Sequence, residues 1–261
     1  MVQWNEDQRV LRALISDMGD VLSKDHVERD SAKAFGREAW DRVRDTGLLG
    51  LPFGAEWGGL GQDLLTTMYV LEGLGEACRD GGLSFAVSTQ MVSTGVPLAR
   101  FGKAELKNRY LPGICDGSII GAHAITEPEG GSDVMSMRTT ADRDGDDFFV
   151  LNGAKTFISN APIADVIVVY ARTGKKGSPA ALTAFLVDRD TPGLQIGRPI
   201  EKMGLRTAPL AEVFFDDCRV PRANVVGSVG AGFLVLDHVM KWEILCSFIM
   251  PPLPNCGPPR D

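Results

Sequence analysis

The sequence predicts an α+β fold in which helices and strands occupy separate parts of the chain. Residues up to about 118 repeat apolar side chains at the three- and four-residue steps of helices. From residue 119 onward, short apolar runs alternate with turn residues, as in strands. Strands follow helices without alternating with them, which excludes a doubly wound α/β sheet. We therefore expect an all-helical domain over residues 1–118 and an antiparallel, barrel- or sandwich-like β-domain over residues 119–228.

Several apolar stripes mark helices in the first of these domains. One stripe runs over residues 11–22, and a second helix is expected over residues 31–46 with Gly47 as its stop. Between this helix and the next stripe, the chain is too rich in glycine and proline for a regular element. Helical spacing then returns three times, over residues 64–74, 83–101 and 106–110.

The β-domain is marked by five apolar runs, at residues 119–125, 148–159, 166–170, 182–187 and 213–215. Asn152-Gly153 interrupts the second run and is typical of a two-residue hairpin turn, so we expect two antiparallel strands there. Helical spacing resumes near Gly232, and we expect a helix over residues 229–250. A proline-rich tail over residues 251–261 cannot continue that helix.

Composition and charge narrow the class of protein. The 261 residues are 44% hydrophobic and 23% charged, as in ordinary folded domains. A formal net charge of −7 argues against a nucleic-acid partner, and no apolar stretch is long enough for a membrane span. The five cysteines are odd in number and lack paired CxxC spacing, which indicates reduced thiols and not a disulfide framework or a metal site. We expect a cytoplasmic protein without a bound metal.

Three segments carry a family resemblance. Residues 124–133, AITEPEGGSD, resemble the TEPxxGSD signature of acyl-CoA dehydrogenases, and residues 151–160, LNGAKTFISN, are similar to the family's NGxKxxIT/S segment. Residues 192–221 contain PG, MGxR and FxxxxVP in the family's order and spacing. Because the three segments occur in order on the expected layout, the chain resembles this family from about residue 47 to residue 233. The resemblance implies the N-terminal helical and middle β-domains. The C-terminal helical domain would be truncated after its first helix, over residues 229–250, and otherwise missing.

The resemblance also implies FAD as the cofactor. A glycine-rich turn after a strand leaves backbone groups free to meet a ligand, and the flavin ring needs such partners together with cover for its flat face. Ser132 is implied in substrate binding as well. At position 123, relatives often carry another aromatic residue, so a ring packed on the flavin and a merely buried histidine both remain open. The implied cofactor contacts are His123, Ile125, Thr126, Gly131, Ser132, Phe157, Ile158 and Ser159.

The family's reaction needs a carboxylate of raised pKa that removes the proton α to a thioester carbonyl, while a hydride leaves the β carbon. In most members this glutamate lies in the C-terminal helical domain. In a minority it lies on the helix after the β-domain, in a D-x-E-R segment, and that position is Glu243 here. Ile244 replaces the usual arginine, so Glu243 is either the base or one polar residue of a helix.

The leading hypothesis is an FAD-dependent acyl-CoA or acyl-carrier-protein dehydrogenase. The resemblance implies an electron-transfer flavoprotein or similar acceptor, and a homo-oligomer or a partner subunit. Two alternatives stay open: a flavin monooxygenase on the same scaffold, and a truncated, non-catalytic or partner-dependent subunit. The glycines at 227–232 have GxxGxG spacing without a βαβ unit, which excludes a dinucleotide-binding loop. Arg206 could bind an anion, although pinning a loop is the favoured role.

Overall fold

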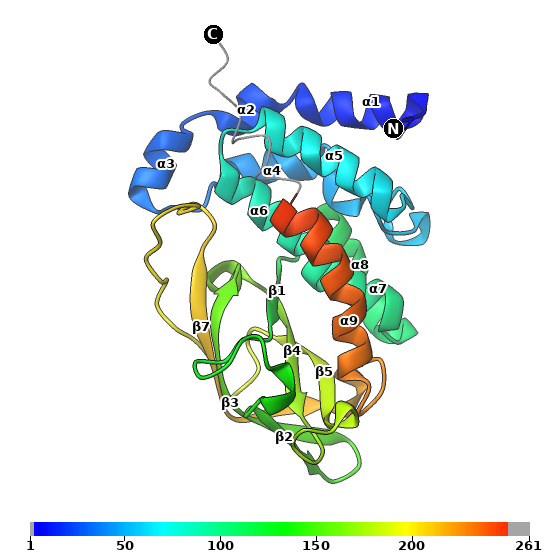
Figure 1. The fold of residues 1–261 in the computed structure, drawn as a ribbon, viewed down its shortest axis with the longest axis vertical. Coiled ribbons are helices and arrows are strands. Elements are labelled where there is room, and N and C mark those ends of the chain that lie inside the picture. The colour runs from blue at the N-terminus through cyan, green and yellow to red at the C-terminus, as the bar shows by residue number, and fades with distance from the viewer. Residues whose placement is uncertain (1–2, 250–261) are drawn as a thin grey trace.

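The structure is a computed structural model of the 261-residue chain, and it describes residues 3–249. Helices form one end of the molecule and a sheet forms the other, which confirms the predicted α+β class (Figure 1). The tail expected over residues 251–261 lies outside the described residues. The helical part contains α1 (Glu6–Ser16), α2 (Gly19–Ser23), α3 (His26–Ala32), α4 (Arg37–Asp45), α5 (Leu64–Ala77), α6 (Gly81–Thr89), the π-helical segment η3 (Gln90–Gly95), α7 (Val96–Phe101) and α8 (Ala104–Asp116).

The helix expected over residues 31–46 is interrupted at residues 33–36, between the end of α3 and the start of α4. Lys33 adopts a left-handed conformation with φ of 54°, and its N–H donates to the carbonyls of Arg29 and Asp30, which ends α3. A new helix, α4, begins at Arg37 and buries Trp40 and Val43. Apolar spacing cannot reveal this break, because the stripe of α4 continues the periodicity of the residues before it.

The β-domain is one open sheet with strand order β6-β7-β3-β2-β4-β5-β8, and β1 pairs with β4. Its strands are β1 (Gly121–Ala124), β2 (Thr140–Asp144), β3 (Phe148–Ser159), β4 (Val166–Arg172), β5 (Leu182–Asp188), β6 (Leu194–Ile196), β7 (Leu210–Pro221) and β8 (Val225–Val226). The neighbours β2–β3, β3–β7, β4–β5, β5–β8 and β6–β7 are antiparallel, but β1 lies parallel to β4. The sheet is therefore mixed and open, whereas the sequence predicted an antiparallel barrel or sandwich.

The hairpin predicted at Asn152-Gly153 is also wrong. Residues 148–159 form the single strand β3, and the pairing of β3 with β7 shifts register between Leu151 and Gly153, as at a β-bulge. Asn152 exchanges two hydrogen bonds with Asp217 across the bulge, at 2.8 and 3.1 Å. A Cβ at Gly153 would lie 2.7 Å from Thr139 Oγ1, so glycine permits a close approach here.

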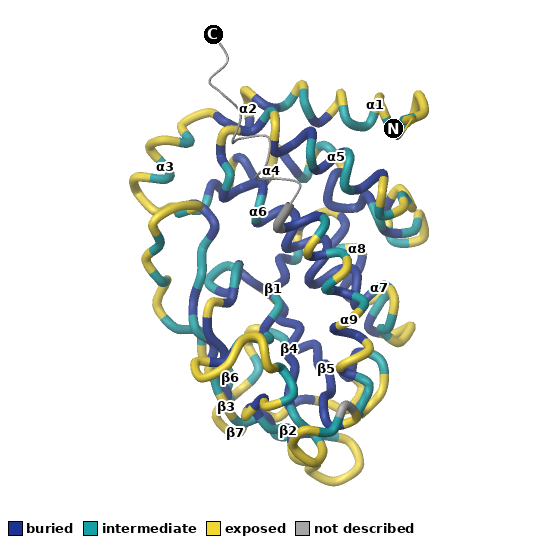
Figure 2. The backbone as a smooth tube through the Cα atoms, viewed as in Figure 1, coloured by how far each residue is buried: buried dark blue, intermediate teal, exposed yellow. Residues whose placement is uncertain are grey.

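Two apolar cores lie on the two faces of the sheet. Alternation along β4 assigns Val166, Val168 and Tyr170 to the core shared with the helices, and Ile167 and Val169 to the core on the opposite face. Figure 2 shows buried backbone, in dark blue, in the helices and again in β4 and β5. β1 therefore places alternate side chains, His123 among them, toward the helical part.

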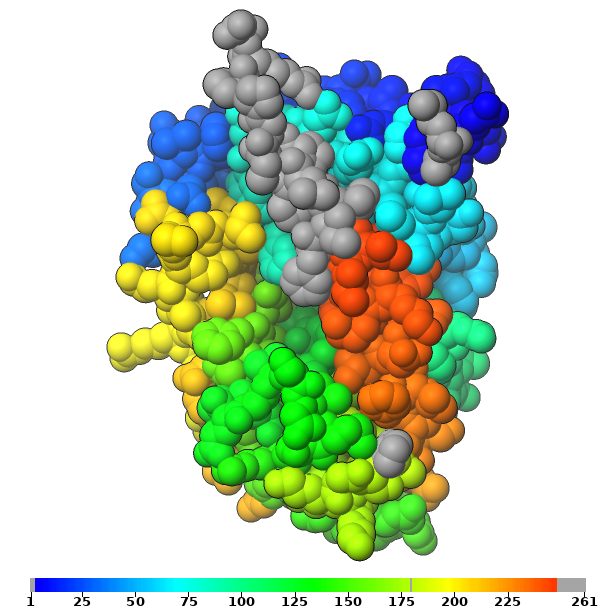
Figure 3. Space-filling view, in the orientation of Figure 1, coloured from blue at the N-terminus to red at the C-terminus, as the bar shows by residue number. Residues whose placement is uncertain are grey.

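The last described elements return to the junction between helices and sheet. α9 (Gly232–Trp242) packs on α7 and β5, and the π-helical segment η8 (Glu243–Ile249) packs on α5, α6 and η3. Figure 3 shows α9, in orange to red, lying along the surface between the cyan helices and the green segment that follows β1. Among residues 3–249, no helix is long and apolar enough to cross a membrane.

Candidate active site

The segment that follows β1 is tied to β3. Lys155 Nζ donates to the carbonyl of Ile125 at 3.0 Å, and the Thr156 N–H donates to the carbonyl of Thr126 at 2.9 Å. Ile125 and Thr126 are both half-buried. The structure therefore brings two implied cofactor contacts, Ile125 and Thr126, next to the strand that carries a third, Phe157.

A buried ion pair holds the turn over residues 127–133. Lys155 Nζ lies 3.0 Å from Glu127 Oε1, and that carboxylate also accepts hydrogen bonds from the N–H groups of Arg138 and Thr139. Burial raises the pKa of Glu127, but Lys155 and the donors from Thr139 and Arg138 outweigh it and leave the pKa below its ordinary value. Burial lowers the pKa of Lys155 to about 8, against the attraction of Glu127.

Sequence reasoning gave no role to Glu127 or Lys155, although both lie inside the quoted motifs. The usable signal was Lys155, the single charged residue of the segment over residues 151–160, together with an acidic residue in the segment over residues 124–133. Buried charges of opposite sign are expected to pair. Their role is to set the shape of the turn on which the candidate ligand contacts lie.

The tip of the turn is open to solvent. Gly131 and Ser132 are exposed, and a Cβ added at Gly131 would come no nearer than 3.6 Å to Thr126 Cγ2. A cavity of about 150 Å³ lies beside this turn. Its lining includes Glu127, Glu129, Gly130, Asp133, Ser136, Met137, Arg138 and Lys176.

The three implied cofactor contacts at the end of β3 differ in exposure. Phe157 lies at a second irregularity of β3, between Lys155 and Ile158, and has φ of 57° with 62% of its surface exposed. Ile158 is buried at 2% exposure in the core of the sheet, so its side chain is not available to a ligand on the surface. Ser159 is half-buried. The geometry makes Phe157 the side chain of the three that faces solvent.

His123 and Glu243, 120 residues apart, meet in the interior. His123 Nδ1 lies 3.0 Å from Glu243 Oε1, and the two side chains are 4% and 10% exposed. The His123 ring also contacts Tyr170 edge-on, with ring centroids 5.2 Å apart. His123 is thus placed against the candidate base on the helical side of β1, and Ile125 follows it by two residues.

The electrostatics of Glu243 differ from what the sequence suggested. Burial raises its pKa, but the adjacent His123 and a hydrogen bond from Ser93 outweigh burial, so the pKa lies below the ordinary value for glutamate. Burial raises the pKa of Tyr170, and the negative charge of Glu243 adds to that effect. A lowered pKa favours the ionised carboxylate, which is the state in which a general base accepts a proton.

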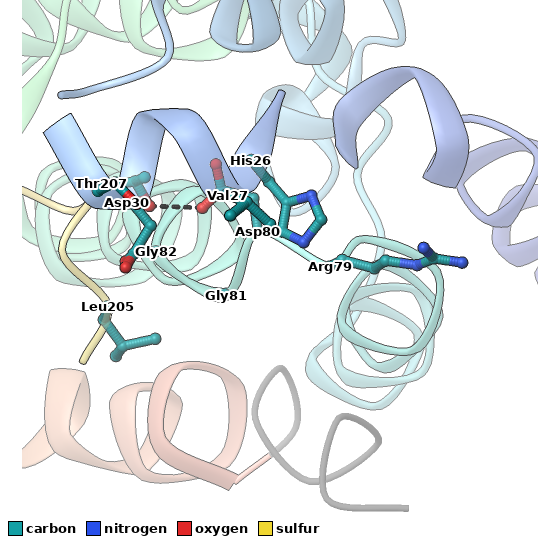
Figure 4. A pocket seen from close by; sticks show the side chains of 10 residues that line it. His26, Val27, Asp30, Arg79, Asp80, Gly81, Gly82, Leu205 and Thr207 are labelled. Atoms are coloured by element: carbon teal, nitrogen blue, oxygen red, sulfur yellow. Dashed lines mark hydrogen bonds between the residues drawn. The ribbon is translucent and has the colours of Figure 1, made fainter. Parts of the chain in front are cut away.

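A larger cavity, of about 540 Å³, lies between α3, the start of α6 and the loop before β7 (Figure 4). None of the expected site residues lines it; the lining is His26, Val27, Asp30, Ser31, Arg79, Asp80, Gly81, Gly82, Leu205 and Thr207. Next to it, Arg206 donates to both carboxylate oxygens of Asp30, at 3.1 Å from its N–H and 2.9 Å from Nε. This contact joins the loop before β7 to α3 and confirms the loop-pinning role expected for Arg206.

Two family profiles match this chain in succession. The acyl-CoA dehydrogenase N-terminal domain matches residues 5–118, and the acyl-CoA dehydrogenase middle domain matches residues 122–218. Together they extend over the helical part and most of the sheet.

Individual relatives agree with these profiles. The L-prolyl-[peptidyl-carrier protein] dehydrogenase of Pseudomonas fluorescens is 39% identical over 84% of this chain and 58% of its own length. The mitochondrial isovaleryl-CoA dehydrogenase of Pongo abelii is 35% identical over 92% of this chain and 57% of its own length. The chain thus spans less than two thirds of the length of these relatives.

Solved structures share the fold. The prolyl acyl carrier protein oxidase AnaB superposes with a TM-score of 0.90 at 39% identity, over 95% of this chain and 67% of that protein. The FAD complex of PigA gives a TM-score of 0.90 at 36% identity, over 95% of this chain and 64% of that one. With the two domain profiles and these relatives, the chain belongs to the acyl-CoA dehydrogenase family.

Proposed function

We propose that this protein is an FAD-dependent dehydrogenase that introduces an α,β double bond into an acyl thioester. The observation that carries the proposal is the position of β1. His123 on this strand binds the ionised Glu243, and Ile125 and Thr126 directly after the strand begin the segment implied in flavin binding. One strand therefore connects a candidate general base to a candidate cofactor site.

The side chains present suit FAD. Phe157 offers an exposed aromatic face, and Gly131 leaves open space beside Thr126, as close approach of a flat ring requires. The Lys155–Glu127 pair holds the turn in shape, so the groups on the turn are already in position before a ligand binds. We infer that Ile125, Thr126, Gly131, Ser132, Phe157 and Ser159 hold the cofactor, with Ile158 contributing through its backbone.

In the proposed reaction, a carboxylate oxygen of Glu243 takes the proton from the carbon α to the thioester carbonyl. When bound, FAD supplies the two-electron oxidant that accepts the hydride from the β carbon. The α and β carbons each lose one hydrogen and become joined by a double bond. Burial of Glu243 excludes water from the carboxylate and so protects the proton transfer from solvent.

The relatives favour one substrate class for a first test. Two of them are named for a prolyl group on a carrier protein, and others for acyl-CoA thioesters. We infer a carrier-bound prolyl or acyl thioester, with an electron-transfer flavoprotein or similar acceptor, in a homo-oligomer or with a partner subunit. Buried thiols at Cys78, Cys115, Cys218 and Cys246 support a reducing, cytoplasmic location.

Anaerobic bleaching of the FAD-loaded protein by thioesters tests this function. Prolyl-carrier protein and a short acyl-CoA are mixed with the wild-type protein and with Glu243→Gln, and the flavin spectrum is followed. The proposal predicts bleaching in the wild type and a rate at least about a hundredfold lower in the variant. Flavin that no thioester bleaches would overturn the dehydrogenase. Substrate-dependent oxygen consumption by the chemically reduced flavin would then favour the monooxygenase.

A further inference from the structure

The direction of the hydrogen bond between His123 and Glu243 depends on the charge of the carboxylate. An ionised carboxylate only accepts hydrogen bonds, so the His123 nitrogen that faces Glu243 at 3.0 Å, Nδ1, carries a proton. The other ring nitrogen, Nε2, is buried and has no hydrogen-bond partner among the described residues. Among the described residues, Glu243 is therefore the side chain that holds the His123 ring by a hydrogen bond.

The surroundings of Glu243 contain few other groups that could set its charge. Tyr170 approaches from β4, and Ser93 adds a hydrogen bond from η3. α6 and η3 carry no titratable side chain. The titratable and charged groups on the remaining elements around η8 are Cys246 on η8 itself; Asp237, His238 and Lys241 on α9; and Tyr69, Glu72 and Glu76 on α5.

Those remaining groups either contact other side chains or, in the case of Cys246, form an uncharged buried thiol. On α9, Asp237 pairs with Lys241 on the surface, and His238 packs on Phe101. On α5, both glutamates bind Arg12 and Tyr69 stacks on Trp4. Cys246 stays neutral, because burial raises the pKa of its thiol to about 12. Among the described residues, His123 is therefore the titratable side chain that hydrogen-bonds Glu243.

A contribution to folding stability does not by itself explain why this pair of side chains is buried. Two charged side chains in the interior lose their hydration, and a well-packed apolar pair in their place is often as stable or more stable. A functional carboxylate, in contrast, gains from a partner that fixes its orientation and its charge. The burial of both groups makes this coupling strong, since solvent screens it little.

We propose that His123 is a positioning residue for Glu243: its Nδ1–H orients the carboxylate and keeps it ionised, ready to accept the substrate's α-proton. The inference rests on the proposed function for the identity of that proton, but the coupling between the two side chains does not. Removal of His123 leaves a buried carboxylate without its hydrogen-bond partner. The proton affinity of Glu243 then rises, and a larger share of the protein carries the base in a protonated, inactive form at neutral pH.

Carboxyl titration in the purified chain tests the coupling without turnover. Glutamate carboxyl carbons are labelled with ¹³C, the Glu243 signal is assigned by its loss in Glu243→Gln, and its shift is followed against pH. His123→Asn keeps a donor near the Nδ1 position without a titrating charge, and His123→Phe removes both. We expect the midpoint to rise by about one to three pH units, with the larger rise in His123→Phe. His238→Asn, which replaces a histidine on α9, should leave the midpoint unchanged.

The FAD-loaded protein tests the consequence for catalysis. The acid limb of the bleaching rate against pH should move upward in step with the carboxyl midpoint, with the rate constant falling more than the thioester affinity. At high pH, His123→Asn should regain most of the wild-type rate, which a merely structural defect would not allow. An identical Glu243 midpoint in all His123 variants overturns the inference. Unbleached flavin in the wild type, with a shifted midpoint in the variants, overturns the dehydrogenase but leaves the coupling standing.

Discussion

Phe157 is the residue where local strain and the candidate cofactor site coincide. A side chain other than glycine in the left-handed region costs about 1–2 kcal/mol, and Phe157 has φ of 57°. Most of its ring surface faces solvent, so folding recovers little of that cost through burial. Strain of this kind clusters at ligand sites, because a ligand can use the conformation that the scaffold imposes.

Phe157→Ala should therefore weaken FAD binding by about 1 kcal/mol, or about fivefold in Kd, because the aromatic cover of the ring is lost. Phe157→Trp should keep or improve the affinity, since the larger ring covers the same face. The Kd is measured by quenching of flavin fluorescence. Leu14→Ala on α1, which also removes an exposed apolar side chain, serves as the control and should have no effect. Equal affinities for Phe157→Ala and the control would remove Phe157 from the site.

The sequence indicated Phe157 as a candidate cofactor contact but did not indicate its left-handed backbone conformation. The family resemblance implied Phe157 as a cofactor contact, and the structure leaves this residue 62% exposed. No glycine or asparagine marks position 157 as left-handed, so only the irregular pairing of β3 with β7 reveals it. The ordinary alternation of a strand also placed Ile158 in the core, which the resemblance alone did not.

At the scale of elements, β3 and the turn after β1 depend on one buried ion pair. Lys155 is fully buried and contacts both Glu127 and the carbonyl of Ile125. Replacing one partner of this pair leaves the charge of the other buried and unpaired. The pair therefore fixes the shape of the turn, whatever its net contribution to stability.

Lys155→Met should lower the free energy of unfolding by about 3–5 kcal/mol, because the Glu127 carboxylate then stays buried without a cationic partner. Lys241→Met is the matched control, because Lys241 pairs with Asp237 on the surface of α9 and the loss should be at most about 1 kcal/mol. Urea denaturation followed by circular dichroism measures both. Losses of similar size in the two variants would show that the buried pair has no special role.

The pH dependence of stability follows from Glu127. Its pKa in the folded protein lies below the ordinary value of 4.5, so its stabilising contribution is fully present above that value and is lost as pH falls through the folded pKa. Between about pH 5 and about pH 3, the wild type should therefore lose more unfolding free energy than Lys155→Met, in which the folded pKa of Glu127 is higher. Parallel curves for the two proteins would contradict this account.

The strand β3 also marks a limit of sequence reasoning about elements. Asn152-Gly153 has the composition of a hairpin turn, yet it forms a bulge within one strand. The outcome depends on partners far away in the sequence: Asp217, which binds Asn152, and Thr139, which leaves no room for a side chain at Gly153. Local composition favours the turn, and tertiary contacts decide otherwise.

At the scale of the whole molecule, the order of helices and strands was predictable and the arrangement of the sheet was not. Helical and strand periodicities are local, so they survive in the sequence. The parallel pairing of β1 with β4, and the contact of His123 with Glu243, each join segments far apart in the chain. The latter contact also explains why the pKa of Glu243 is lowered, where the sequence alone suggested a raised value.

The central claim is that the 261-residue chain forms a flavin site. Its most direct test is the flavin-to-protein ratio, read from the visible spectrum after incubation with FAD and gel filtration. Our account predicts stoichiometric FAD bound to the eluted protein, with less retained by Phe157→Ala. A folded protein that elutes colourless after incubation with excess FAD would contradict it.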